Sequence, residues 1–170
     1  MLICLLVISI LLVASYVGAA TWSEKELPDS ISAMVYLLPE KGRWLWIVWI
    51  WAATFTLTPI LFEVMPDYWQ VLAHGFATSM LFVGAMPLVR HEANKGHYAL
   101  AISAGIFSQL CVLAISHVWM LTWSVLAVIA IFTKSSGEFP KRLTSKGVTI
   151  IEIVCYVNLI GAIITHLLKN

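Results

Sequence analysis

Residues 41–64 read KGRWLWIVWIWAATFTLTPILFEV, and this stretch decides the class of fold. Two cations, Lys41 and Arg43, come just before a run from Trp44 to Val64 that carries a single charge, at Glu63. An α-helix rises about 1.5 Å per residue and the hydrocarbon core of a bilayer is about 30 Å thick, so a run of about 20 apolar residues spans it. The stretch predicts a transmembrane helix with its cations held at one membrane face.

The chain contains five more stretches of this kind. They are residues 2–20, 69–89, 98–116, 119–133 and 148–168. Over the 170 residues, 61% are hydrophobic and 11% are charged, whereas a soluble domain carries about 25% charged residues. Lipid must therefore cover much of the surface. We expect one integral membrane domain over residues 1–170, an all-α polytopic bundle of six transmembrane helices. The stretch 119–133 is short, and we expect Lys134 to extend it by reaching the headgroups.

The basic residues predict an orientation, because Lys and Arg concentrate in cytoplasmic loops. Nine of the ten lie in alternate loops, and Lys169 alone lies on the opposite side. We expect a cytoplasmic (inner) membrane protein with both termini outside. A cleaved signal peptide ending near Val17-Gly18-Ala19 is an alternative that reverses the sides. The nine residues are Lys25, Lys41, Arg43, Arg90, Lys95, Lys134, Lys141, Arg142 and Lys146.

The loop after the first span contains its own helix signal. Pro28-Asp29-Ser30 is typical of a helix start, because Asp and Ser side chains accept hydrogen bonds from unpaired amide groups. Four apolar residues then recur at the spacing of one helical face. We expect a short amphipathic helix lying in the membrane interface. The face consists of Ile31, Met34, Val35 and Leu38.

The same loop carries a resemblance. Asp29-Ser30-Ile31-Ser32, with Tyr36 four residues on, follows the first span. Together with the six-span pattern, this segment resembles a group of small, uncharacterised bacterial and phage membrane proteins that have a Ser-Ile-Ser…Tyr segment at that point. The resemblance covers about the first 100 residues and implies no activity.

Polar residues within the spans are costly in lipid and are the first places to look for a site. Gln109 and Asn158 lie near mid-depth, and Glu152 lies about one turn inside the last span. Either they join helices by hydrogen bonds or they line a polar path for a solute. Glu152 could instead reach water or pair with Arg142 or Lys146.

The opposite end of the predicted bundle gathers His74, His117 and His166, with Glu63 and Asp67 nearby. Imidazole and carboxylate groups at one depth could hold zinc, and an open zinc position could activate water. The idea resembles, in concept, the membrane hydrolases related to alkaline ceramidases, which hold zinc among histidines from different helices. His74 and His166 could alternatively hold a haem. Neither cofactor is favoured.

The remaining polar groups predict no site. Lys95-Gly96-His97 is interpreted as an ordinary polar turn, and Cys4, Cys111 and Cys155 as small apolar residues within helix contacts. The net charge of +1 excludes the charge excess that nucleic-acid binding needs.

We therefore expect a small non-enzymatic membrane protein that acts through helix and loop contacts, as an accessory, assembly or exclusion factor. Its partners are the bilayer and either a second copy or another membrane protein. The alternatives are a small oligomeric transporter or channel, and an outward-facing metal-dependent hydrolase.

Overall fold

The computed structural model describes residues 1–24, 30–38, 40–89, 95–127 and 147–169. These residues form an all-α structure without strands, and the predicted fold class, a bundle of six helices, is confirmed. Five of the helices are long and apolar enough to cross a membrane, and a shorter apolar helix covers His117–Ala127.

The long helices coincide with the predicted spans to within a few residues. Their bounds are α1 (Leu2–Glu24), α2 (Glu40–Val64), α3 (Gln70–Val89), α4 (Lys95–Ile115) and α7 (Gly147–Lys169). Short 3₁₀ helices lie between them: η1 (Met34–Leu37), η2 (Asp67–Trp69) and η3 (His117–Met120). Residues 128–133 of the predicted fifth span lie outside the described residues.

Local chemistry explains the tight turn between α2 and α3. Pro66 has no amide hydrogen and disfavours a helical conformation at the residue before it. The helix accordingly ends at Val64, and the amide of Met65 makes a last bond to the Leu61 carbonyl at 3.0 Å. Pro66 then precedes η2, and α3 follows directly.

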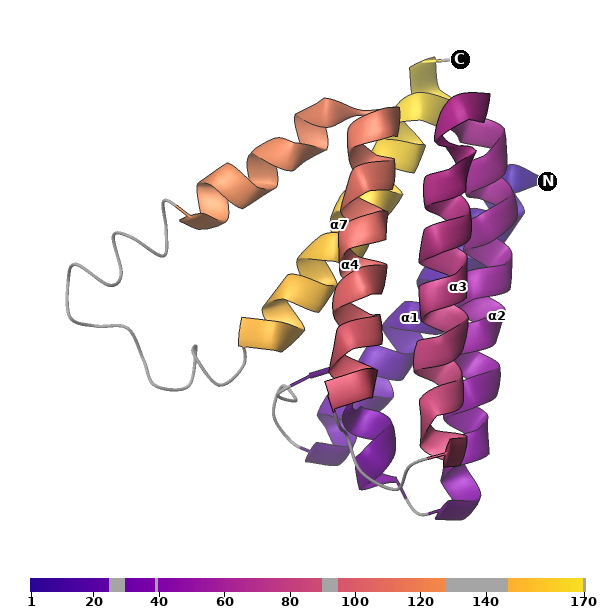
Figure 1. Ribbon diagram of the computed structural model, residues 1–170, viewed down its shortest axis with the longest axis vertical. Helices are drawn as coiled ribbons and strands as arrows, with labels where there is room; N and C mark the ends of the chain where they lie inside the picture. Colours follow the sequence, from indigo (N-terminus) through magenta and orange to yellow (C-terminus); the bar gives the residue numbers. More distant parts are fainter. Residues whose placement is uncertain (25–29, 39, 90–94, 128–146, 170) are drawn as a thin grey trace.

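The helices are arranged so that α3 packs between α2 and α4, with α1 against α2 and α7 against α4 and α2. Both termini lie at one end of the bundle, and the first residues of α2 and α4 lie at the other (Figure 1). The helix His117–Ala127 leaves the top of α4 and diverges from the bundle (Figure 1).

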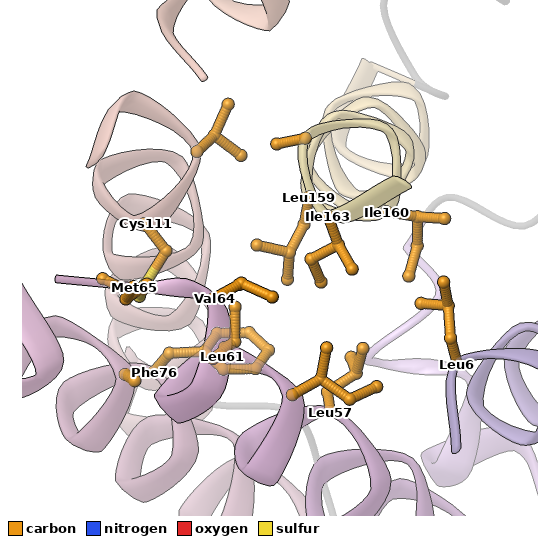
Figure 2. Packing of buried hydrophobic residues seen from close by; sticks show 14 residues of the cluster. Leu6, Leu57, Leu61, Val64, Met65, Phe76, Cys111, Leu159, Ile160 and Ile163 are labelled. Carbon is orange, nitrogen blue, oxygen red and sulfur yellow. The ribbon is translucent and has the colours of Figure 1, made fainter. Parts of the chain in front are cut away.

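The main core lies where α1, α2 and α7 meet, with α3 and α4 closing it. Figure 2 shows Leu159 and Ile163 of α7 directed toward Leu57 and Leu61 of α2, while Leu6 of α1 approaches Ile160. Leu61 and Ile163 are fully buried. Because lipid tails are as apolar as these side chains, close packing rather than expulsion from water stabilises such contacts.

A second cluster joins α1, α2 and the segment of residues 30–38. Tyr16 lies against Trp46 and Trp49, with ring centroids 4.4 and 4.9 Å apart, and Met34 and Val35 are buried beside them. The predicted amphipathic helix is thus a turn followed by η1. Part of its apolar face packs against the protein's own helices, because the aromatic rings of α1 and α2 lie beneath it.

Candidate functional site

The Glu152 carboxylate, on the second turn of α7, accepts hydrogen bonds from the Ser30–Ser32 segment. Its Oε2 accepts the Ile31 amide at 2.6 Å. Its Oε1 accepts the Ser32 hydroxyl at 2.6 Å, the Ser30 hydroxyl at 3.1 Å and the Ser32 amide at 3.3 Å. Hydrogen bonds to a charged acceptor are about twice as strong as those between neutral groups. The first loop is therefore fastened to the last helix.

The local fold of the segment prepares these donors. The Ser30 hydroxyl oxygen accepts the Ala33 amide at 3.3 Å, which closes the turn that leads into η1. Tyr16 of α1 donates its hydroxyl to the Ile31 carbonyl at 3.2 Å. With the carbonyl and the amide of Ile31 both bonded, the backbone has one orientation, and its N–H groups point to Glu152.

His97, in the first turn of α4, joins the same cluster. Its Nε2 lies 3.3 Å from the Ser32 hydroxyl oxygen, and its Nδ1 lies 3.3 Å from the Tyr36 hydroxyl. The side chain is fully buried. One assignment of hydrogens satisfies the three contacts from Tyr36 to Glu152: Tyr36 donates to Nδ1, Nε2–H donates to Ser32, and Ser32 donates to Glu152. The prediction that His97 belongs to an ordinary polar turn is wrong.

Tyr36 is the last side chain in this series of hydrogen bonds, at the end of the bundle. Burial raises the pKa of the Tyr36 phenol above its ordinary value, against the opposing effect of Arg43. The phenol therefore keeps its hydrogen through neutral pH and can serve as the donor to His97. The side chain remains partly exposed.

A hydroxyl between an imidazole and a carboxylate resembles a serine nucleophile, but the surroundings do not serve acyl transfer. An oxyanion hole needs free donors aimed at the developing charge. The amides of Ile31 and Ser32 are directed to Glu152 instead. In serine hydrolases the acid also orients the histidine, whereas here the His97 Nδ1 faces Tyr36. The arrangement fastens elements together and links protonatable groups.

A second polar cluster lies deeper, around Gln109. Its Oε1 accepts the Asn158 amide at 3.0 Å and the Trp123 indole at 2.8 Å. Its Nε2 donates to the Cys155 carbonyl at 3.1 Å. Asn158 is fully buried, and its Oδ1 accepts the Thr122 hydroxyl at 2.9 Å. The cluster joins α4, α7 and the helix His117–Ala127. Gln109 and Asn158 are hydrogen-bonded to each other, whereas Glu152 has other partners.

The structure does not assemble the predicted metal ligands. Among the described residues, no three His, Cys, Asp or Glu side chains lie close enough to hold an ion. His74 is exposed on α3 with its ring 4.6 Å from that of Phe62, His117 is exposed in η3, and His166 is half-buried near the end of α7. Glu63 is exposed at the end of α2. Arg142 and Lys146, the predicted partners of Glu152, lie outside the described residues.

Sequence reasoning missed His97, Ser32 and Tyr36 as members of one site, although a signal was present. The Ser-Ile-Ser segment, the start of α4 and the start of α7 all fall at the same predicted membrane face. Grouping polar residues by face and depth would have brought them together with Glu152.

No family model, curated protein or solved structure matches the chain. The fold and the two clusters define the class: a helical bundle whose apolar helices are suited to a membrane, with polar groups bonded between helices.

Proposed function

We propose that this protein is a small multi-pass membrane protein that works through contacts with a membrane partner, as an accessory, assembly or exclusion factor, and not by catalysis. The observation that carries the proposal is the Gln109 cluster. Both polar atoms of the Gln109 amide, and both of the Asn158 amide, are engaged by groups of this chain. Polar groups used in this way hold helices in register and are not available to a passing solute.

The same proposal places the protein in the cytoplasmic membrane with both termini outside. The end of the bundle that carries Arg43 and Lys95 would face the cytoplasm, because basic residues are retained there. The Glu152 cluster lies at that end, since Ser32 precedes α2 and His97 is in the first turn of α4. This cluster consists of Glu152 with Ser30, Ile31, Ser32, Tyr36 and His97. It would hold the first cytoplasmic loop in a fixed shape for a partner to recognise.

The transporter alternative receives less support. It predicts a shared polar cavity for Gln109, Asn158 and Glu152, whereas Glu152 is bonded to Ile31 and Ser32. The hydrolase alternative depends on a converging metal site at His74, His117 and His166, and no such group is found among the described residues. Contacts between membrane proteins need neither a polar cavity nor a metal site.

Site-specific photo-crosslinking in native membranes tests the proposal. A photoreactive amino acid is placed, one position at a time, on lipid-facing side chains of different helices. A contact protein gives a discrete protein adduct from one or two of the helices, whereas a protein surrounded only by lipid gives none. Suitable exposed positions are Val7, Val48, Phe82, Ile106 and Val157.

The fully buried Leu61 serves as the control position, since its side chain meets only this chain. Flux assays in liposomes complement the crosslinking. We expect flat traces for ions and small solutes. Saturable flux with no adduct at any exposed position would contradict the proposal and favour the transporter.

A further inference from the structure

The Glu152 cluster also contains a continuous series of protonatable side chains. Four protonatable side chains form one unbroken series from Tyr36 of η1, through His97 of α4 and Ser32 of the first loop, to Glu152 of α7. The three links measure 3.3, 3.3 and 2.6 Å. One end is a partly exposed phenol and the other is the acid of the last helix.

The donor role of Ser32 toward Glu152 gives the series one direction. If Ser32 donates to the short Glu152 contact, His97 must donate from Nε2, and its Nδ1 must accept from Tyr36. A carboxylate inside a span would make a poor relay alone, but an ordered chain of hydroxyl and imidazole groups passes protons between neighbours. We propose that Tyr36, His97 and Ser32 form a proton relay that protonates and deprotonates Glu152.

A hydronium ion at the bundle end gives a proton to the Tyr36 oxygen, while the Tyr36 proton passes to His97 Nδ1. The Nε2 proton of His97 passes to Ser32 Oγ, and the Ser32 proton passes to Glu152 Oε1. The carboxylate becomes a carboxylic acid and the hydronium becomes water. The three relay groups stay neutral with their donor directions reversed.

Protonation of Glu152 has a structural consequence. A carboxylic acid is a weaker acceptor than a carboxylate, so the bonds from Ile31 and Ser32 weaken and the first loop loosens from α7. Among the described residues, Tyr16 of α1 and Cys155 of α7 also lie within the influence of the Glu152 charge. Arg43 and Tyr98 lie near the Tyr36 end. The relay thus couples proton uptake to the contact between the first loop and the last helix.

Time-resolved infrared spectroscopy after a rapid drop in pH tests this inference on the full chain in proteoliposomes. The carboxylic acid band that is missing in Glu152→Gln identifies Glu152. In Tyr36→Phe we expect the band to appear about 100-fold more slowly, the low end of what a positioned proton donor contributes. The band should reach the same final amplitude, because the carboxylate and its loop donors are retained. If Tyr36 had only a structural role, Tyr36→Phe would not slow the appearance of the band while leaving its final amplitude unchanged.

Tyr98→Phe is the matched control. Tyr98 also contacts the His97 ring edge-on, with centroids 5.7 Å apart, yet it is exposed and outside the series. Its rate should equal that of the native protein. An unchanged rate in Tyr36→Phe would overturn the relay, and so would the lack of a Glu152 acid band at every pH at which the protein stays folded. Neither result bears on the crosslinking that tests the proposed function.

Discussion

The Glu152 carboxylate accepts the backbone N–H of Ile31 at 2.6 Å, although the two residues are 121 positions apart in the sequence. The contact fastens the loop after the first helix to the last helix of the bundle. Within the described part of the chain, Glu152 supplies the acceptor for the Ile31 amide, so the first loop makes this bond only when α7 is docked.

Removal of the Glu152 carboxylate should be among the more destabilising single changes at this end of the bundle. Glu152→Ala leaves the partly buried Ile31 and Ser32 amides without their acceptor, at an expected cost of about 3 kcal/mol. Glu152→Gln retains one acceptor oxygen and should cost about half of that. Unfolding by denaturing detergent measures both. Glu63→Ala, at an exposed acid on α2, should match the native protein, and an equal loss there would refute the assignment.

The pair Gln109 and Asn158 should behave as one unit. Gln109→Leu removes the acceptor of the Asn158 and Trp123 donors and should lower stability by about 1–2 kcal/mol, as for polar contacts between membrane helices. The double variant with Asn158→Leu should lose about 1 kcal/mol less than the sum of the single variants, because the residues share a bond. Ser103→Ala, whose hydroxyl bonds only within α4, is the neutral control. Strict additivity would contradict a shared network.

Gly84 marks a close approach of α3 to α2. A methyl group added there would clash with the Ile50 side chain and lie 2.9 Å from the Trp51 indole. Gly84→Ala should therefore cost about 1–3 kcal/mol through overpacking. At Gly18 of α1 an added methyl group meets nothing within 4 Å, so Gly18→Ala should not destabilise. Thermal unfolding in detergent compares the two. A tolerated Gly84→Ala would show that α2 and α3 are farther apart.

The proposed orientation makes a labelling prediction. Tyr68 of η2 is 78% exposed and lies just before α3, at the end of the bundle opposite to Lys95, the first residue of α4. In a background without native cysteines, Tyr68→Cys should react with a membrane-impermeant maleimide on intact cells. Lys95→Cys should react only after permeabilisation. The reverse pattern would invert the orientation, as a cleaved signal peptide requires.

The sequence predicted the helices but not the members of the Glu152 cluster. The bounds of α2 and α3 follow from long apolar runs and from Pro66 between them, which are local features. Gln109 and Asn158 were found because polar groups are rare within such runs. His97 was missed because it stands among Lys95 and Gly96 and looks solvated, whereas the packing of η1 and the first loop buries it completely.

The sequence by itself determined the class and the order of the helices, because these depend on hydropathy along the chain. The placement of Lys and Arg predicts the membrane face of each loop. Only the tertiary structure decided which side chains meet. Helices that are apolar on nearly every side carry little signal of their rotation, so the contacts of Glu152 with Ile31, and of His97 with Ser32, were set by packing between distant segments.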